Sequence, residues 1–186
     1  MADDSTLSDA DLISSTLHGS EEAFAQLVAR HRTRVLQTAA RFARHQHEMD
    51  DLAQEIFLRM YKRLRQFRGE APFTHWLARL TTTTCYDFLR RERRTREQVP
   101  LDLITWEVAD AAPEAAARVL AARELLAHLM RQLLPEEQLI LTLCELEERP
   151  LTEVAQLTGW SLANVKVRAF RARARLKTLL ANEPTH

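Results

Sequence analysis

Residues 151–166 read Leu-Thr-Glu-Val-Ala-Gln-Leu-Thr-Gly-Trp-Ser-Leu-Ala-Asn-Val-Lys, and this stretch decides the fold of the C-terminal part of the chain. Thr152 and Ser161 are residues of the kind that begin helices, and Gly159 between them can adopt the left-handed backbone of a tight turn. The core that the two helices share is expected to comprise Val154, Leu157, Leu162 and Val165. The stretch therefore predicts a helix-turn-helix.

The second helix of this motif has two unlike faces. Its buried stripe is expected to comprise Leu162, Val165, Ala169, Ala172 and Leu176. Phe170 and Arg171 lie opposite that stripe, with Asn164 and Lys166 on its flanks. Such a face suits a helix in the major groove of DNA, where apolar groups meet thymine methyls and Arg or Asn reads base edges. The alternative is that Phe170 covers a core against another helix.

Upstream of this motif the chain divides into two helical stretches. Apolar residues recur at helical spacing from residue 20 to about residue 96, lose that spacing around residues 97–113, and regain it after Pro113. Pro135 suits the first position of a further helix. We therefore expect an all-α chain of two small helical domains, residues 1–96 and 114–186, joined by a flexible linker over residues 97–113. The run Thr81–Thr84 disfavours a helix and needs tertiary support or a function.

Composition agrees with this fold class. The 186 residues are 46% hydrophobic, which is enough for one or two small cores, and three Gly and six Pro are too few for a sandwich, a barrel or a Gly-rich phosphate loop. Cys85 and Cys144 lie far apart and in no CxxC-type spacing, which implies neither a disulfide framework nor a cysteine-based zinc site and fits a reducing compartment. We expect both to be buried and inert. The start has no apolar signal region and no stretch reaches 18 apolar residues, so a soluble, cytoplasmic protein is expected.

Charge is balanced overall and uneven locally. The chain has 26 Lys plus Arg and 26 Asp plus Glu, so it is not a globally basic nucleic-acid coat. Basic residues nevertheless cluster within residues 59–68, 90–96 and 166–177. One such cluster is often just a solvated helix face, but three Arg-rich clusters favour contact with phosphate backbones.

Four motifs in the chain resemble those of a known family. Asp50-Asp-Leu-Ala-Gln-Glu-Ile-Phe-Leu-Arg-Met-Tyr61, Phe67-Arg-Gly-Glu-Ala-Pro-Phe-Thr-His-Trp-Leu-Ala-Arg-Leu80 and Asp87-Phe-Leu-Arg-Arg91 resemble region 2 of bacterial sigma factors. Val165-Lys-Val-Arg-Ala-Phe-Arg-Ala-Arg173 resembles their region 4. The motifs occur in the family's order, over nearly the whole chain, with only a short linker between the regions. This arrangement resembles the extracytoplasmic-function (ECF) group of sigma factors.

The resemblance implies three contact sets. Core RNA polymerase, through its β′ and β subunits, would meet Asp51, Gln54, Glu55 and Leu58, which a helix places on one face. The -10 promoter element, received as flipped single-stranded bases by the loop 67–73 and the helix after it, would meet Arg68, Gly69, Glu70, Ala71, Arg79, Thr83, Arg90, Arg91 and Arg94. The -35 element, read as a duplex, would meet Ser161, Asn164, Lys166, Val167, Arg168, Phe170, Arg171 and Arg173.

Some positions near the expected -10 site need a separate interpretation. Phe73 and Trp76 are expected in the core rather than against bases. Thr83 stands where the family often has Asn, and a hydroxyl cannot make the bidentate contact of an amide, which leaves the base preference there open. The resemblance also implies an anti-sigma partner. Because the function is binding, it implies no catalytic residue, cofactor or metal.

Two other functions fit parts of the sequence. A stand-alone helix-turn-helix regulator would have a similar C-terminal helix, but it would bind duplex DNA by itself and would not need the face of Asp51, Gln54 and Glu55. A metal-dependent enzyme is suggested by the crowding of histidines and carboxylates within residues 45–51. His45 and His47 cannot share one face of a helix, so we interpret this segment as a polar turn between helices.

Overall fold

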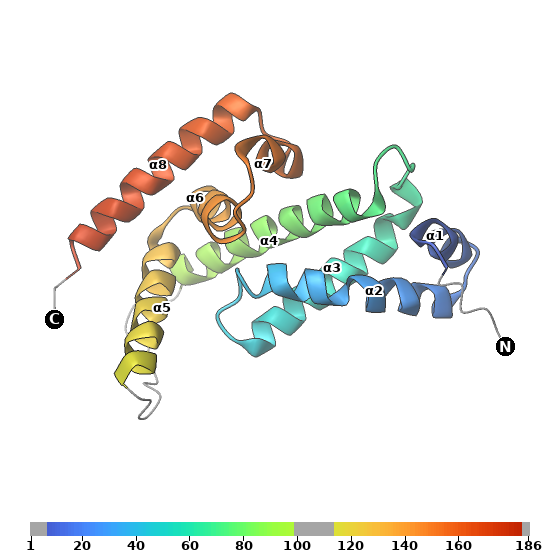
Figure 1. Cartoon of the computed structure of the whole chain (residues 1–186), viewed down its shortest axis with the longest axis horizontal. Coiled ribbons are helices and arrows are strands. Elements are labelled where there is room, and N and C mark those ends of the chain that lie inside the picture. The colour runs from blue at the N-terminus through green and yellow to red at the C-terminus, as the bar shows by residue number, and fades with distance from the viewer. Residues whose placement is uncertain (1–6, 99–113, 184–186) are drawn as a thin grey trace. The chain divides into compact units, whose positions relative to one another are not determined.

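The computed structural model describes residues 7–98 and 114–183, and these residues form helices and turns without strands (Figure 1). No helix among them is both long and apolar enough to cross a membrane. The chain divides into two compact units, Met1–Cys85 and Tyr86–His186, and the division falls inside one helix. Most of the expected linker, residues 99–113, lies outside the described residues, so the domain limits proposed above stay predictions.

Unit 1 contains the first helices of the chain. They are α1 (Asp9–Leu17), α2 (Glu21–Ala39), α3 (Gln46–Arg63), a 3-10 turn (Leu64–Gln66) and α4 (Phe73–Gln98), which continues into unit 2. Helix α1 packs against α2, and α2 packs against α3. Each helix turns an apolar stripe inward, and Leu27 of α2 and Ile56 of α3 are completely buried there.

Helix α1 lies within the predicted first domain but upstream of residue 20, where the recognised apolar periodicity begins. The Ser8 hydroxyl accepts a hydrogen bond from the Asp11 amide at 3.2 Å, and the Asp11 carboxylate accepts one from the Ser8 amide at 3.0 Å. The Ser8 hydroxyl also donates to Asp11 Oδ2 at 2.6 Å, and this bond, followed by the one from the Ser8 amide, lowers the pKa of Asp11. Leu12 and Ile13 are buried behind this capping box. The spacing of Ser8 and Asp11 is a known helix-start signal that the apolar periodicity alone did not reveal.

The threonine run in α4 is supported by burial. Thr81, Thr82 and Thr84 are at most 4% exposed. The hydroxyl of Thr84 donates to the Leu80 carbonyl oxygen at 2.8 Å, which satisfies a buried polar group within the helix itself. The tertiary support that the sequence requires for these β-branched residues is therefore present.

Unit 2 contains the remaining helices. Beyond the end of α4 they are α5 (Glu114–Gln132), α6 (Pro135–Leu141), a π-helical turn (Thr142–Leu146), α7 (Leu151–Thr158) and α8 (Leu162–Ala181). As predicted, Pro135 is the first residue of α6. A core cluster formed by Met130, Leu133, Leu141 and Ala172 joins α5, α6 and α8.

Helices α7 and α8 form the predicted helix-turn-helix. Gly159 ends α7 with φ 75°, a left-handed conformation that costs other residues energy, and the Ser161 hydroxyl accepts a hydrogen bond from the Asn164 amide at 3.2 Å. Two expectations were wrong. The cap residue of α7 is Pro150 and not Thr152. Leu162 is 36% exposed because it lies in the first turn of α8, outside the shared core.

Candidate functional site

The outer face of α3 carries the residues expected to bind a protein. Leu52, Ile56 and Met60 fill the core, and the opposite side leaves Gln54 exposed and Leu58 51% exposed. A single exposed leucine is ordinary, but Leu58 and Tyr61, which is 56% exposed, line the same apolar pocket, and a continuous exposed apolar patch is typical of a binding surface.

Two carboxylates complete this face, and they differ in their surroundings. The Asp51 side chain is 65% exposed, and its Oδ2 lies 3.0 Å from His47 Nδ1. Glu55 is only 25% exposed, and its Oε1 accepts a hydrogen bond from Arg59 at 2.6 Å. Asp51 is therefore more accessible to a cationic partner, whereas Glu55 would have to share its charge with Arg59.

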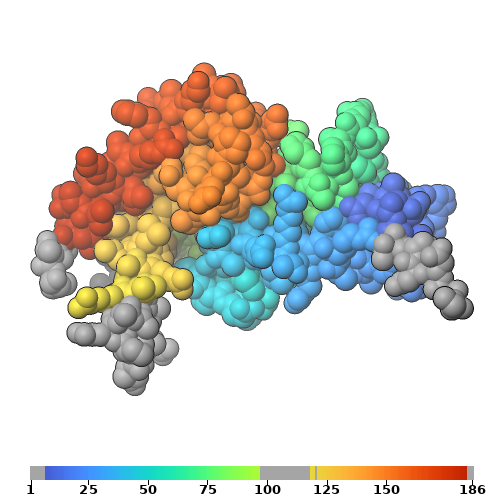
Figure 2. All heavy atoms as spheres, viewed as in Figure 1, coloured from blue at the N-terminus to red at the C-terminus, as the bar shows by residue number. Residues whose placement is uncertain are grey.

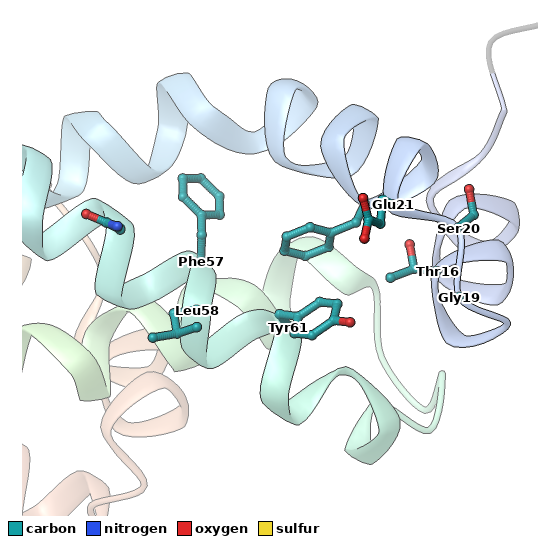
Figure 3. Close-up of a pocket in the computed structure, with 9 residues that line it drawn as sticks. Thr16, Gly19, Ser20, Glu21, Phe57, Leu58 and Tyr61 are labelled. Carbon is teal, nitrogen blue, oxygen red and sulfur yellow. The ribbon is translucent and has the colours of Figure 1, made fainter.

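An apolar pocket of about 480 Å³ adjoins this face. It lies between the α1–α2 turn, the first turns of α2 and the outer side of α3, and Figure 3 shows Phe57 rising toward α2 and the Tyr61 hydroxyl directed toward α1. The Phe24 and Tyr61 rings meet edge to face at 4.9 Å. Gln54 and Leu58 line the pocket and also belong to the predicted set. Sequence reasoning missed the pocket because its walls come from three helices.

The loop before α4 is fully exposed around its turn. Gly69 has φ 74°, which favours glycine at this position. The side chains of Arg68 and Glu70 are 82% and 79% exposed, and their charged groups are 4.0 Å apart, so this surface pair holds the loop only weakly. Ala71 is exposed as well. The predicted base-binding residues of the loop are thus accessible from solvent.

An aromatic cluster anchors both ends of this loop. The ring centroid of Phe73 lies 5.4 Å from that of Phe67 and 5.5 Å from that of Trp76, and Phe67 and Trp76 are 5.7 Å apart. Phe73 is 5% exposed, so its predicted core position is confirmed. Trp76 is half-buried and stacks on Phe73, so its predicted burial is only partial.

The other residues predicted to contact the -10 element lie along α4. Arg79, Arg90, Arg91 and Arg94 are exposed. The Thr83 hydroxyl is half-buried and donates to the carbonyl oxygens of Arg79 and Leu80 at 3.1 and 2.9 Å. Its hydrogen is therefore used within the helix, and only its oxygen lone pairs remain for a base.

The outer face of α8 matches the face expected to bind DNA. Phe170 is 73% exposed and Val167 is 48% exposed, while Val165, Ala169 and Ala172 are buried beneath them. Asn164, Lys166 and Arg171 are exposed as well. Figure 2 shows the atoms of α8, in red, uncovered on the face of unit 2 that is in view. The alternative in which Phe170 covers a core is therefore wrong.

The cations of α8 differ in their local partners. Arg173 pairs with Glu145 at 2.7 Å and Arg175 with Glu137 at 3.7 Å. Arg171, in contrast, has no ion pair with any residue in the described part of the chain. Which cations of α8 form ion pairs could not be predicted from the α8 sequence alone, because their acidic partners come from α6 and the turn after it.

Arg168 is held from three sides. Its Nε donates to Asn164 Oδ1 at 2.5 Å, its Nη1 lies 3.5 Å from Glu136, and its guanidinium lies 4.6 Å from the centre of the Trp160 ring. An ion pair and a cation–π contact together restrict a guanidinium more than a surface ion pair alone. Arg168 is thus placed on the flank of the exposed face.

The histidine-rich segment at the start of α3 and the two cysteines are the remaining candidates for metal binding or redox chemistry. Residues 46–51 form the first turns of α3, so the polar turn expected for residues 45–51 is wrong, and only His45 precedes the helix, which it caps by accepting from the Glu48 amide at 3.3 Å. No cluster of three potential metal-binding side chains occurs within residues 7–98 and 114–183. Cys85 is fully buried, as expected. Cys144 is half-buried, and burial raises the pKa of its thiol.

Comparison with known proteins gives a consistent result. Residues 27–95 match the family model of sigma-70 region 2, and residues 123–176 match that of sigma-70 region 4. The ECF RNA polymerase sigma factor SigE of Mycolicibacterium smegmatis is 31% identical over 84% of this chain, which spans 61% of that relative's length. SigM of Mycobacterium tuberculosis, another ECF RNA polymerase sigma factor, is 29% identical over 93% of this chain and 85% of its own.

A solved structure extends this similarity to the fold. CnrH, determined in complex with the cytosolic domain of CnrY, is 27% identical, with a TM-score of 0.60 over 95% of this chain and 99% of that one. The matched regions contain the exposed face of α3, the loop before α4 and the helix-turn-helix. The chain therefore belongs to the sigma-70 family of RNA polymerase sigma factors, in its extracytoplasmic-function group.

Proposed function

We propose that this protein binds core RNA polymerase and directs it to specific promoters. The observation that carries the proposal is the outer face of α3, where an exposed carboxylate, an exposed amide and a half-exposed leucine adjoin an apolar pocket. A regulator that binds DNA by itself does not need such a face for that activity. The function consists of binding, and no catalytic step is assigned to any residue.

The polymerase contact is formed by Asp51, Gln54, Glu55 and Leu58. Hot spots of protein interfaces combine an apolar anchor with polar groups around it, and Leu58 is such an anchor. The Asp51 carboxylate favours a basic surface on the large β′ subunit, since opposite charges steer association. The pocket beside Gln54 and Leu58 gives an apolar side chain of the partner room to enter.

Promoter DNA is held in two ways. The -10 element is received as single-stranded bases around Gly69, Glu70 and Ala71, while Arg68, Arg79, Thr83, Arg90, Arg91 and Arg94 line the path of the strand. The -35 element is read as duplex by the exposed face of α8. Phe170 and Val167 suit thymine methyls and Arg171 suits a base edge, while Ser161, Asn164, Lys166, Arg168 and Arg173 position the backbone.

We also propose a regulatory protein partner of the anti-sigma type. Its support is the solved complex of CnrH with the cytosolic domain of CnrY. A partner that covers the α3 face would compete directly with polymerase. This regulation would take place where polymerase acts, in the cytoplasm.

In-vitro transcription on a promoter library tests the proposal. Purified protein is added to bacterial core RNA polymerase as wild type, Gln54→Ala and Glu55→Ala, with Gln37→Ala as the matched control because Gln37 is an exposed glutamine on α2. Promoter-specific transcripts that weaken in the two α3 variants and persist in the control support the proposal. A protein that neither binds nor redirects core polymerase, yet shifts duplex DNA alone, is a stand-alone regulator instead.

A further inference from the structure

A buried histidine ties the first helix of the chain to the core of unit 1. His31 on α2 is 6% exposed, and its Nε2 lies 3.0 Å from Oδ2 of Asp9, the first residue of α1. A carboxylate can only accept, so Nε2 carries the hydrogen of this bond. The other carboxylate oxygen of Asp9 accepts from Arg30 Nη1 at 2.8 Å. Both oxygens of Asp9 are thus committed to α2.

The opposite contact of His31 leads to the promoter-binding loop. Its ring meets that of Phe73 edge to face, with centroids 5.2 Å apart and planes at 64°. Phe73 is the first residue of α4 and the last residue of the loop 67–73, and it also packs on Phe67 and Trp76. A continuous line of contacts therefore runs from Asp9 through His31 to the ring where the loop ends.

We propose that Asp9 and His31 are positioning residues for the loop 67–73, a role that rests on the proposed function. The loop has little of its own to hold it, since its turn residues are exposed and Arg68 and Glu70 form only a distant surface pair. Its shape therefore depends on where its ends are fixed. An edge-to-face contact favours one ring orientation, and the Asp9 hydrogen bond prevents the His31 ring from turning away from Phe73.

Pre-organisation of this kind affects DNA capture and not polymerase binding. A loop that is already ordered loses less conformational entropy when it receives unpaired bases. The α3 face that contacts polymerase is built from Asp51, Gln54 and Leu58, none of which takes part in the line from Asp9 to Phe73. Breaking that line is therefore expected to separate the two activities.

Two acids in the first turn of α1 provide a matched test. Asp9→Ala removes the acceptor of His31. Asp11→Ala removes the capping-box acid, whose carboxylate accepts from Ser8, and so weakens α1 without removing a bond to the histidine. Asp9→Asn keeps a carbonyl oxygen that can accept from Nε2. Each full-length variant is measured for its Kd with core polymerase. The complex of each variant with core polymerase, the holoenzyme, is then measured for its Kd with a fluorescent DNA single strand. This strand carries the non-template -10 sequence identified by transcription from the promoter library.

We expect Asp9→Ala to weaken strand binding about tenfold while the Kd for core stays within about twofold. Asp9→Asn recovers most of the loss, and Asp11→Ala stays near wild type. The positioning role is overturned if Asp9→Ala and Asp11→Ala weaken strand binding equally, or if core binding falls in parallel with strand binding. If wild-type holoenzyme does not hold the strand at all, the proposed function itself fails, which is a different result.

Discussion

Helices α3 and α8 follow the same construction and present opposite chemistry. Each buries one apolar stripe, α3 through Leu52 and Ile56 and α8 through Val165 and Ala169. The outer face of α3 shows a carboxylate, an amide and Leu58 beside an apolar pocket, whereas the outer face of α8 shows Phe170 among cations. The comparison teaches that the buried stripe determines the fold and that the solvent face determines whether the partner is a protein or a nucleic acid.

The largest expected effect is on the protein-binding side of this comparison. Leu58→Arg places a charge where an apolar side chain should be covered, and we expect it to weaken core polymerase binding about 100-fold. Leu7→Arg is the control, since Leu7 is similarly exposed at 47% and lies outside the pocket. Binding is measured by fluorescence anisotropy with labelled core. Equal losses in both variants would mean that the α3 face has no special role.

The next effect tests whether the cations of α8 are equivalent. Arg171→Ala is expected to cost about 1–3 kcal/mol at the cognate -35 duplex and to relax base preference there. Arg173→Ala is expected to cost less than about 1 kcal/mol, because Arg173 is already paired with Glu145. Competition among duplex variants for the holoenzyme measures both. A loss for Arg171→Ala that is uniform over all sequences would make it a phosphate contact.

A smaller effect is expected for the threonine that replaces the family's asparagine. Thr83→Ala should change -10 preference or the yield of open complex while stability falls by no more than about 0.5 kcal/mol, because alanine is the better helix former. Thr84→Ala is the matched control, as its hydroxyl bonds to the same Leu80 oxygen but is fully buried. Unchanged promoter opening by Thr83→Ala, together with a drop of several degrees in melting temperature, would contradict this role.

The smallest expected effect is a loss of stability at acid pH, which should differ between the first turn of α3 and the first turn of α8. Burial opposes ionisation of Glu48, but hydrogen bonds from Arg44 outweigh it and lower the pKa of this carboxyl below 4.5. Because the pKa of Glu48 is lower in the folded than in the unfolded state, its ionised carboxylate stabilises the folded state above pH 4.5. This stabilisation is lost as the pH falls through the lowered pKa. Helix α8 is capped by Ser161, whose hydroxyl does not titrate in this range.

Amide NMR signals are suited to this measurement. Acidification is expected to weaken the first turn of α3 before that of α8, and Glu48→Gln should remove the difference. If both helix starts lose protection at the same pH in the wild type, Glu48 does not govern the start of α3.

Local signals in the sequence predicted the parts of the site that depend on one helix. Gly159, Ser161 and the stripe from Val165 to Ala172 follow from turn chemistry and helical spacing, which require no knowledge of the rest of the fold. The pocket beside Leu58 and the pairing of Arg173 with Glu145 depend on segments distant in sequence, so spacing along one helix could not reveal them. The burial of His31 against Asp9 belongs to the same class.

The glutamates beside α8 have a consequence for ionic strength. When a free cation meets a DNA phosphate, ions condensed on the duplex are released to solution, and binding then weakens steeply as salt rises. Arg168, Arg173 and Arg175 already have carboxylates as neighbours, so moving them to phosphate exchanges one anion for another. Binding of the -35 duplex should therefore depend on salt less steeply than the six cations between residues 166 and 177 suggest. The affinity of α8 for duplex DNA should accordingly change less over a given range of ionic strength than the affinity of a helix whose six cations are all unpaired.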